Sequence, residues 1–146
     1  MTESKKQLKI ASCLLLILAV CTIIELIAAL SFGEINSVAI PEGAPENTIL
    51  IAKIFIIVVS AVLLIPQFYI GIKGIRIAKK STQSKAHIYW AIALLALNIV
   101  SLINPIVGII NQVDTRDNVS SLLNLLLETI ILFDYIRYAR AVAKGK

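Results

Sequence analysis

The sequence predicts an all-α integral membrane protein, a four-helix bundle in up-down-up-down order with both termini in the cytoplasm. Three observations predict it: an apolar composition, four long apolar runs, and basic residues concentrated at the termini and the middle connection. Of the 146 residues, 58% are apolar and 16% charged, and mean hydropathy is +0.88. A soluble domain is about 45–50% apolar and about 25% charged. The composition therefore argues against a cytoplasmic enzyme, a disordered chain or a disulfide scaffold.

The first element is expected over residues 10–32. Three lysines precede this run, so a secretory signal peptide is an alternative to a membrane helix. A signal core has about 7–15 apolar residues and ends at a small-residue cleavage site. This run has 23 residues, contains Glu25, and shows no such site before Gly33. We therefore expect a retained membrane helix.

The remaining elements are expected over residues 48–72, 88–110 and 118–138. Each run is long enough to cross about 30 Å of hydrocarbon as a helix. Only helices or closed barrels can span a bilayer, and these continuous runs lack the alternation typical of a barrel. Because the connections are short, residues 1–146 are expected to form one transmembrane domain.

The distribution of lysine and arginine predicts the orientation. The net charge is +5, which in a soluble chain would suggest nucleic acid as a partner, but here the charges lie between the apolar runs. Three segments on one side carry twelve of the fourteen basic residues: Lys5, Lys6, Lys9, Lys73, Arg76, Lys79, Lys80, Lys85, Arg137, Arg140, Lys144 and Lys146. The positive-inside rule then places both termini and the middle connection in the cytoplasm. Nucleic acid is not an expected partner.

Two charged residues lie within the first two runs. At 1.5 Å per residue, Glu25 and Lys53 are each roughly 8–10 Å below the outer surface. A short connection between antiparallel helices would bring them together, so a buried ion pair is one hypothesis. The alternative is that Lys53 extends outward to the headgroups, while Glu25 is protonated or faces another helix.

The third and fourth runs carry polar residues near mid-membrane. Glu128 and Asn98 are each about ten residues into their runs, and Asn124 lies one turn from Glu128. Polar groups in hydrocarbon are costly and usually face protein or a cavity. Two hypotheses stay open: a hydrogen bond between Glu128 and an amide such as Asn98, or a site for protons or cations.

Two prolines fall inside apolar runs. Pro66 and Pro105 each remove one backbone hydrogen bond, so each is expected to kink its helix and free the carbonyl groups of Val62 and Ser101. Transporters use such carbonyl groups to bind ions, although kinks are also routine in membrane helices.

Beyond residue 72 the helical pattern continues into a basic segment. Its charges are expected to contact anionic lipid headgroups. Each basic residue near such a surface gains about 1 kcal/mol of favourable interaction energy. The residues concerned are Lys73, Arg76, Lys79, Lys80 and Lys85. The aromatic residues Tyr89 and Trp90 that follow are typical of the membrane interface.

No catalytic motif, cofactor motif or metal-ligand cluster occurs, and Cys13 and Cys21 are too far apart on one helix to pair. We therefore expect no enzyme and no cofactor. The leading hypothesis is a non-enzymatic accessory, assembly or immunity-type subunit that binds helices of other membrane proteins or of its own copies. The alternative is a homo-oligomeric transporter or channel with an intramembrane carboxylate. The expected location is the cell membrane, multi-pass, of the bacterial cytoplasmic type.

Overall fold

The computed structural model describes residues 2–31, 47–80, 85–112 and 115–145, and these form helices without strands. The elements are α1 (Glu3–Ser31), α2 (Asn47–Lys80), α3 (Ala86–Ser101), α4 (Ile103–Ile110) and α5 (Thr115–Ala143). They provide four stretches long and apolar enough to cross a membrane, because α3 and α4 together form one of them. The all-helical class and the four spans expected from the sequence are confirmed for the described residues.

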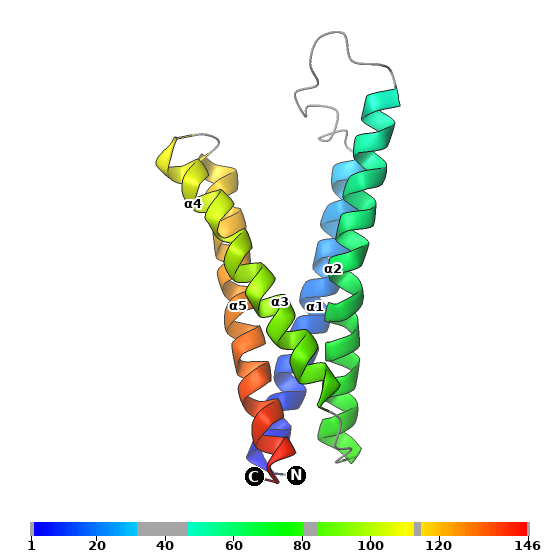
Figure 1. The fold of residues 1–146 in the computed structure, drawn as a ribbon, viewed down its shortest axis with the longest axis vertical. Coiled ribbons are helices and arrows are strands. Elements are labelled where there is room, and N and C mark those ends of the chain that lie inside the picture. Colours follow the sequence, from blue (N-terminus) through cyan, green and yellow to red (C-terminus); the bar gives the residue numbers. More distant parts are fainter. Residues whose placement is uncertain (1, 32–46, 81–84, 113–114, 146) are drawn as a thin grey trace.

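The helices form a V (Figure 1). α1 packs against α2 and α5, and α3 packs against the same two helices. The four spans therefore form one bundle where the arms meet. α4 contacts α3 and α5 but neither α1 nor α2, which leaves the two arms apart at the other end. Both chain termini lie at the closed end of the V.

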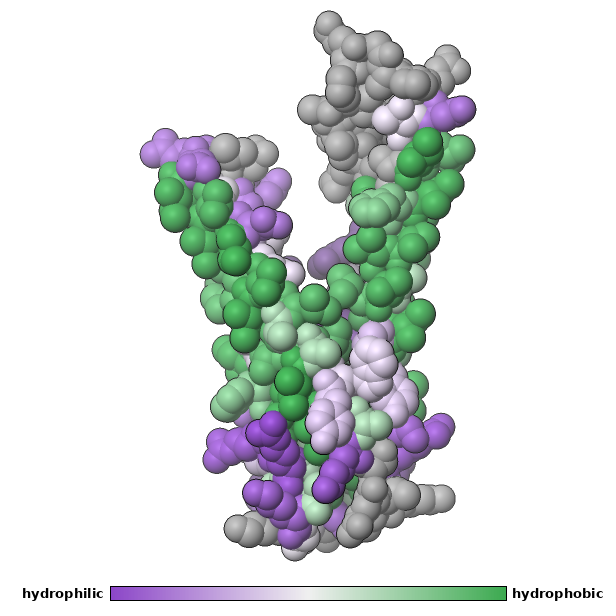
Figure 2. Space-filling view, in the orientation of Figure 1, coloured by the Kyte–Doolittle hydropathy of each residue, from purple (hydrophilic) through white to green (hydrophobic). Residues whose placement is uncertain are grey.

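The core lies in the closed half of the bundle. Its largest fully buried side chains include Tyr135, Leu8, Leu15, Ile70 and Leu132, which come from α1, α2 and α5. At most 22% of any span's most apolar window is buried, so the outer surface is mainly apolar, as Figure 2 shows. Hydrophilic side chains gather around the closed end. Such a surface suits a hydrocarbon solvent and agrees with a multi-pass membrane protein.

Three helices approach most closely at Gly74 of α2. A Cβ atom placed there would overlap Ser12 Oγ of α1 and would lie 2.6 Å from Tyr135 Cε2 of α5. Ser12 donates a hydrogen bond to the Leu8 carbonyl group within its own helix, at 2.6 Å. Tyr135 donates from its hydroxyl group to the Ile70 carbonyl group of α2, at 2.9 Å. Glycine therefore lets three backbones meet where larger residues would hold them apart.

The third span is interrupted at Leu102, where α3 ends and α4 begins. Pro105 follows within one turn and has no backbone N–H group to donate to the Ser101 carbonyl group. In contrast, α2 continues as a helix through Pro66.

The helices extend beyond the apolar runs at the closed end. α2 continues to Lys80 and α5 to Ala143, whereas hydropathy alone places their ends near residues 72 and 138. The apolar run ends at the first charged residues, but the helix itself can continue into water because its backbone hydrogen bonds do not require apolar side chains. The connection between α1 and α2, residues 32–46, lies outside the described residues.

Candidate functional site

A polar cavity of about 190 Å³ lies between the two arms, near the point where they join. Its walls come from all four spans, and the space-filling view shows hydrophilic side chains on the inner walls of the notch (Figure 2). The polar residues of the lining are Thr22, Ser60, Gln67, Asn98, Ser101 and Glu128. Leucines from α2, α3 and α5 fill the rest of the lining. The cavity therefore combines a carboxyl group, two amides and three hydroxyl groups within a mainly apolar bundle.

Helical spacing explains how these side chains meet. On α2, Ser60, Leu64 and Gln67 recur at intervals of four and three residues, which places them on one face. Asn98 and Ser101 on α3 have the same spacing. Each of these helices thus presents a narrow polar face, and the fold turns the faces toward a common space.

Glu128 and Asn98 are neighbours at the cavity. The Asn98 side chain interacts with the Glu128 carboxyl group, across the interface between α3 and α5. The Asn98 Nδ2 atom is buried and has no hydrogen-bond partner among the described residues. The amide of Asn98 therefore keeps donor capacity that the described residues do not use.

Two other cavity residues bond to the backbone of α1. Gln67 is buried and donates from Nε2 to the Leu15 carbonyl group at 3.5 Å, a long hydrogen bond. Thr22 donates to the Leu18 carbonyl group at 3.0 Å, within its own helix. The hydroxyl group of Thr22 therefore has its hydrogen-bond acceptor within its own helix, as is common for serine and threonine in helices.

The structure does not pair Glu25 with Lys53. Glu25 is exposed and Lys53 is half-buried, and no ion pair joins them although both belong to the described part of the chain. Neither residue lines the polar cavity. The packing of α1 on α2 brings Ser12 and Gly74 into contact instead, because small side chains let the two backbones approach there.

Asn124 is exposed and is not among the residues of the cavity wall. In its helix, the cavity is lined by Leu125 and Glu128, three residues apart. Asn124 lies next to Leu125 and is therefore rotated by about 100° from that face. Its spacing of one turn from Glu128 predicts a shared polar site, and the structure places only Glu128 at the cavity.

The basic residues of the closed end differ in their surroundings. Arg76, Lys79 and Lys85 are exposed, and Lys73 places its Nζ atom 5.9 Å from the ring centre of Tyr69. The side chain of Lys80 lies outside the described part. Most of this group is thus accessible to a partner at the membrane surface.

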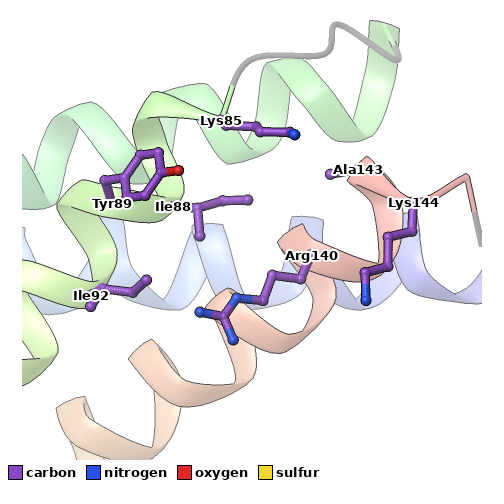
Figure 3. Close-up of a pocket in the computed structure, with 7 residues that line it drawn as sticks. All are labelled: Lys85, Ile88, Tyr89, Ile92, Arg140, Ala143 and Lys144. Atoms are coloured by element: carbon purple, nitrogen blue, oxygen red, sulfur yellow. The ribbon is translucent and has the colours of Figure 1, made fainter.

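Sequence reasoning missed a second hollow, of about 390 Å³, between the closed ends of α3 and α5 (Figure 3). Its basic residues are Lys85, Arg140 and Lys144. From the sequence alone, Arg140 and Lys144 indicate only the orientation of the chain. Their spacing of four residues indicates one basic face on this helix, but it does not indicate that α3 lies beside that face.

The described ranges contain no group of three or more His, Cys, Asp or Glu side chains that could hold a metal ion. The polar cavity can accept and donate hydrogen bonds around one carboxyl group, and it can hold a polar side chain, water or a cation. Comparisons with models of known protein families, with curated proteins and with solved structures find no match.

Proposed function

We propose that this chain is a small, non-enzymatic subunit of a membrane protein complex and that it binds a transmembrane helix between its two arms. The membrane is of the bacterial cytoplasmic type. In this arrangement the spans run up-down-up-down, and the basic closed end faces the cytoplasm, as the positive-inside rule implies. The bound helix belongs to another membrane protein or to a second copy. An accessory, assembly or immunity-type role would use the same contact.

The observation that carries the proposal is the polar cavity at the base of an open V. Glu128, Asn98 and Gln67 belong to three of the four candidate spans and line a space bounded by both arms. Acyl chains offer no hydrogen-bond partner, so polar groups at this depth require protein or water. A helix with a serine, threonine or asparagine side chain at the same depth would supply such a partner.

The shape of the molecule supports the same occupant. α4 contacts neither α1 nor α2, so among the described helices the inner surfaces of the arms lack the neighbour that they have lower in the bundle. Leu63 and Leu97 extend the lining with apolar surface, from α2 and α3 respectively. A helix between the arms would therefore pack against both of them and meet polar groups at the base.

Site-specific photocrosslinking in membranes tests the proposal. A photoreactive residue replaces Leu63 or Leu97 in the lining, and matched controls replace Val62 or Ile99, which are exposed on other faces of the same helices. The lining positions should give a discrete protein adduct that the controls do not give. If all four positions react with lipid alone, no helix occupies the cleft and the proposal is wrong.

A second function is supported by Glu128 itself. A carboxyl group at a polar cavity within the span can load and release a proton or cation, as such groups do in transporters. A homo-oligomer in proteoliposomes would then move protons or cations. Glu128→Gln should abolish this flux, whereas Glu25→Gln, at an exposed carboxyl group of α1, should not. Equal flux in both variants would exclude Glu128 as the transported ion's site.

A further inference from the structure

The hollow between α3 and α5 has basic side chains on both of its sides. In Figure 3, Lys85 and Tyr89 project from the α3 side, Arg140 and Lys144 from the α5 side, and Ile88 lies between them. The hollow measures about 390 Å³, within the range of small-molecule sites. We call it the basic groove. It is separated from the polar cavity, with which it shares no lining residue.

Among the described residues, no acidic side chain neutralises the charges of the basic groove. No acidic residue lines it, and the described acidic residues of the closed end, Glu3 and Asp134, lie elsewhere. Glu3 accepts a hydrogen bond from Gln7, and Asp134 lines a small hollow between α1 and α5. The N-terminus of α3 adds the positive end of its helix dipole beside Lys85. The groove therefore favours an anion.

The apolar part of the basic groove leads into the membrane span. Ile88 is buried in its floor, and Ile92 lies one turn further along α3. Tyr89 is 69% exposed and Trp90 is 51% exposed, and such aromatic residues are typical of the membrane–water boundary. A ligand at this level meets basic groups at the surface and apolar side chains below them.

We propose that the basic groove binds an anionic phospholipid, with its phosphate group at Lys85, Arg140 and Lys144 and an acyl chain along Ile88 and Ile92. Arginine and lysine both bind phosphate oxygens strongly, and the arginine fork can do so through two parallel hydrogen bonds. A soluble phosphate ester shares this headgroup chemistry but leaves the apolar floor without a partner. The site does not depend on which helix occupies the cleft between the arms.

Fluorescence of a single tryptophan in the groove lining provides the test. Trp90 is the chain's single tryptophan and does not line the groove, so the reporter protein carries Tyr89→Trp together with Trp90→Phe. The full-length protein is reconstituted in phosphatidylcholine vesicles with a minor fraction of phosphatidylglycerol that carries brominated acyl chains. Quenching is compared with that by the same fraction of brominated phosphatidylcholine. Lipid bound in the groove should quench more strongly than its share of the bilayer predicts.

Two triple variants with the same change in charge separate a groove from general surface charge. The groove variant is Lys85→Gln, Arg140→Gln and Lys144→Gln. The control variant is Lys73→Gln, Arg76→Gln and Lys79→Gln, all on α2 and outside the groove. The groove variant should lose at least about tenfold in apparent affinity for the anionic lipid, and the control much less.

Three results would overturn the proposal. Equal losses in both triple variants would mean diffuse attraction to a basic surface, and no excess quenching in the reporter protein with its three groove charges intact would mean no site. Full competition by millimolar glycerol phosphate would assign the groove to a soluble phosphate. If the groove triple variant fails to fold, Arg140→Gln alone should still weaken binding about fivefold, and an unchanged affinity there would also refute the site.

Discussion

Replacing Gly74 with valine should destabilise the bundle because three helices meet at this residue. A Cβ atom at position 74 would lie 2.6 Å from Tyr135 Cε2 and 3.1 Å from Ser12 Cβ, and would overlap Ser12 Oγ. Neither neighbour moves freely, since each donates a hydrogen bond to a backbone carbonyl group. Overpacking of this kind costs about 1–3 kcal/mol.

Helix propensity partly offsets that cost, and the offset differs between substituents. Alanine in place of glycine stabilises a helix by about 1 kcal/mol, whereas valine gives only about 0.3–0.5 kcal/mol. The Cβ atom of alanine meets the same two neighbours, so we expect Gly74→Ala to lose at most about 2 kcal/mol. Gly74→Val should lose more than Gly74→Ala, in the range of about 0.5–2.5 kcal/mol, because it adds two further methyl groups. Adding Ser12→Ala removes the closest obstructing atom and should restore part of the loss.

Reversible unfolding in mixed detergent micelles, with increasing mole fraction of sodium dodecyl sulfate, measures this stability. Ala61→Val is the matched control, since Ala61 is exposed on the same helix and gains two methyl groups without a neighbour in the bundle. The Gly74→Val and Ser12→Ala pair should show a coupling of about 0.5 kcal/mol or more in a double-mutant cycle. If Gly74→Val unfolds together with the Ala61→Val control, the close approach of α1, α2 and α5 is refuted.

Three further predictions use the same unfolding assay or hydrogen exchange. Tyr135→Phe removes the hydrogen bond to the Ile70 carbonyl group and should cost about 0.5–1.5 kcal/mol; a loss below the error of the assay would mean that this bond does not hold α5 to α2. Gln67→Leu removes a bond of 3.5 Å to α1 and should cost less than Tyr135→Phe, because the bond is long and leucine suits an apolar wall; the reverse order would contradict this ranking. Pro105→Ala provides an N–H group that can bond to the Ser101 carbonyl group, so amide exchange around the break at Leu102 should slow, and unchanged exchange would show that proline does not cause the interruption.

The polar cavity illustrates the limits of sequence reasoning. Glu128 and Asn98 were expected at similar depth, and the fold makes them neighbours at the cavity, where Gln67 and Thr22 join them. Glu25 and Lys53 were also expected at similar depth, and the fold keeps them unpaired among the described residues. Depth along a helix follows from counting residues, whereas rotation about its axis depends on the neighbouring helices.

The sequence by itself determined that four helical spans exist and approximately where they lie. The free energy of moving a segment into hydrocarbon is close to the sum of the transfer free energies of its residues. The positions of the spans can therefore be predicted without knowing any tertiary contact. The cytoplasmic position of the basic end remains a prediction from the same kind of sum. Only the tertiary structure decided that the arms part beyond the bundle, that the basic groove forms between α3 and α5, and which polar residues share a cavity. These spans are apolar around most of their circumference, so the narrow polar faces of α2 and α3 indicate one protein-facing side but not which helix packs against the rest of each span.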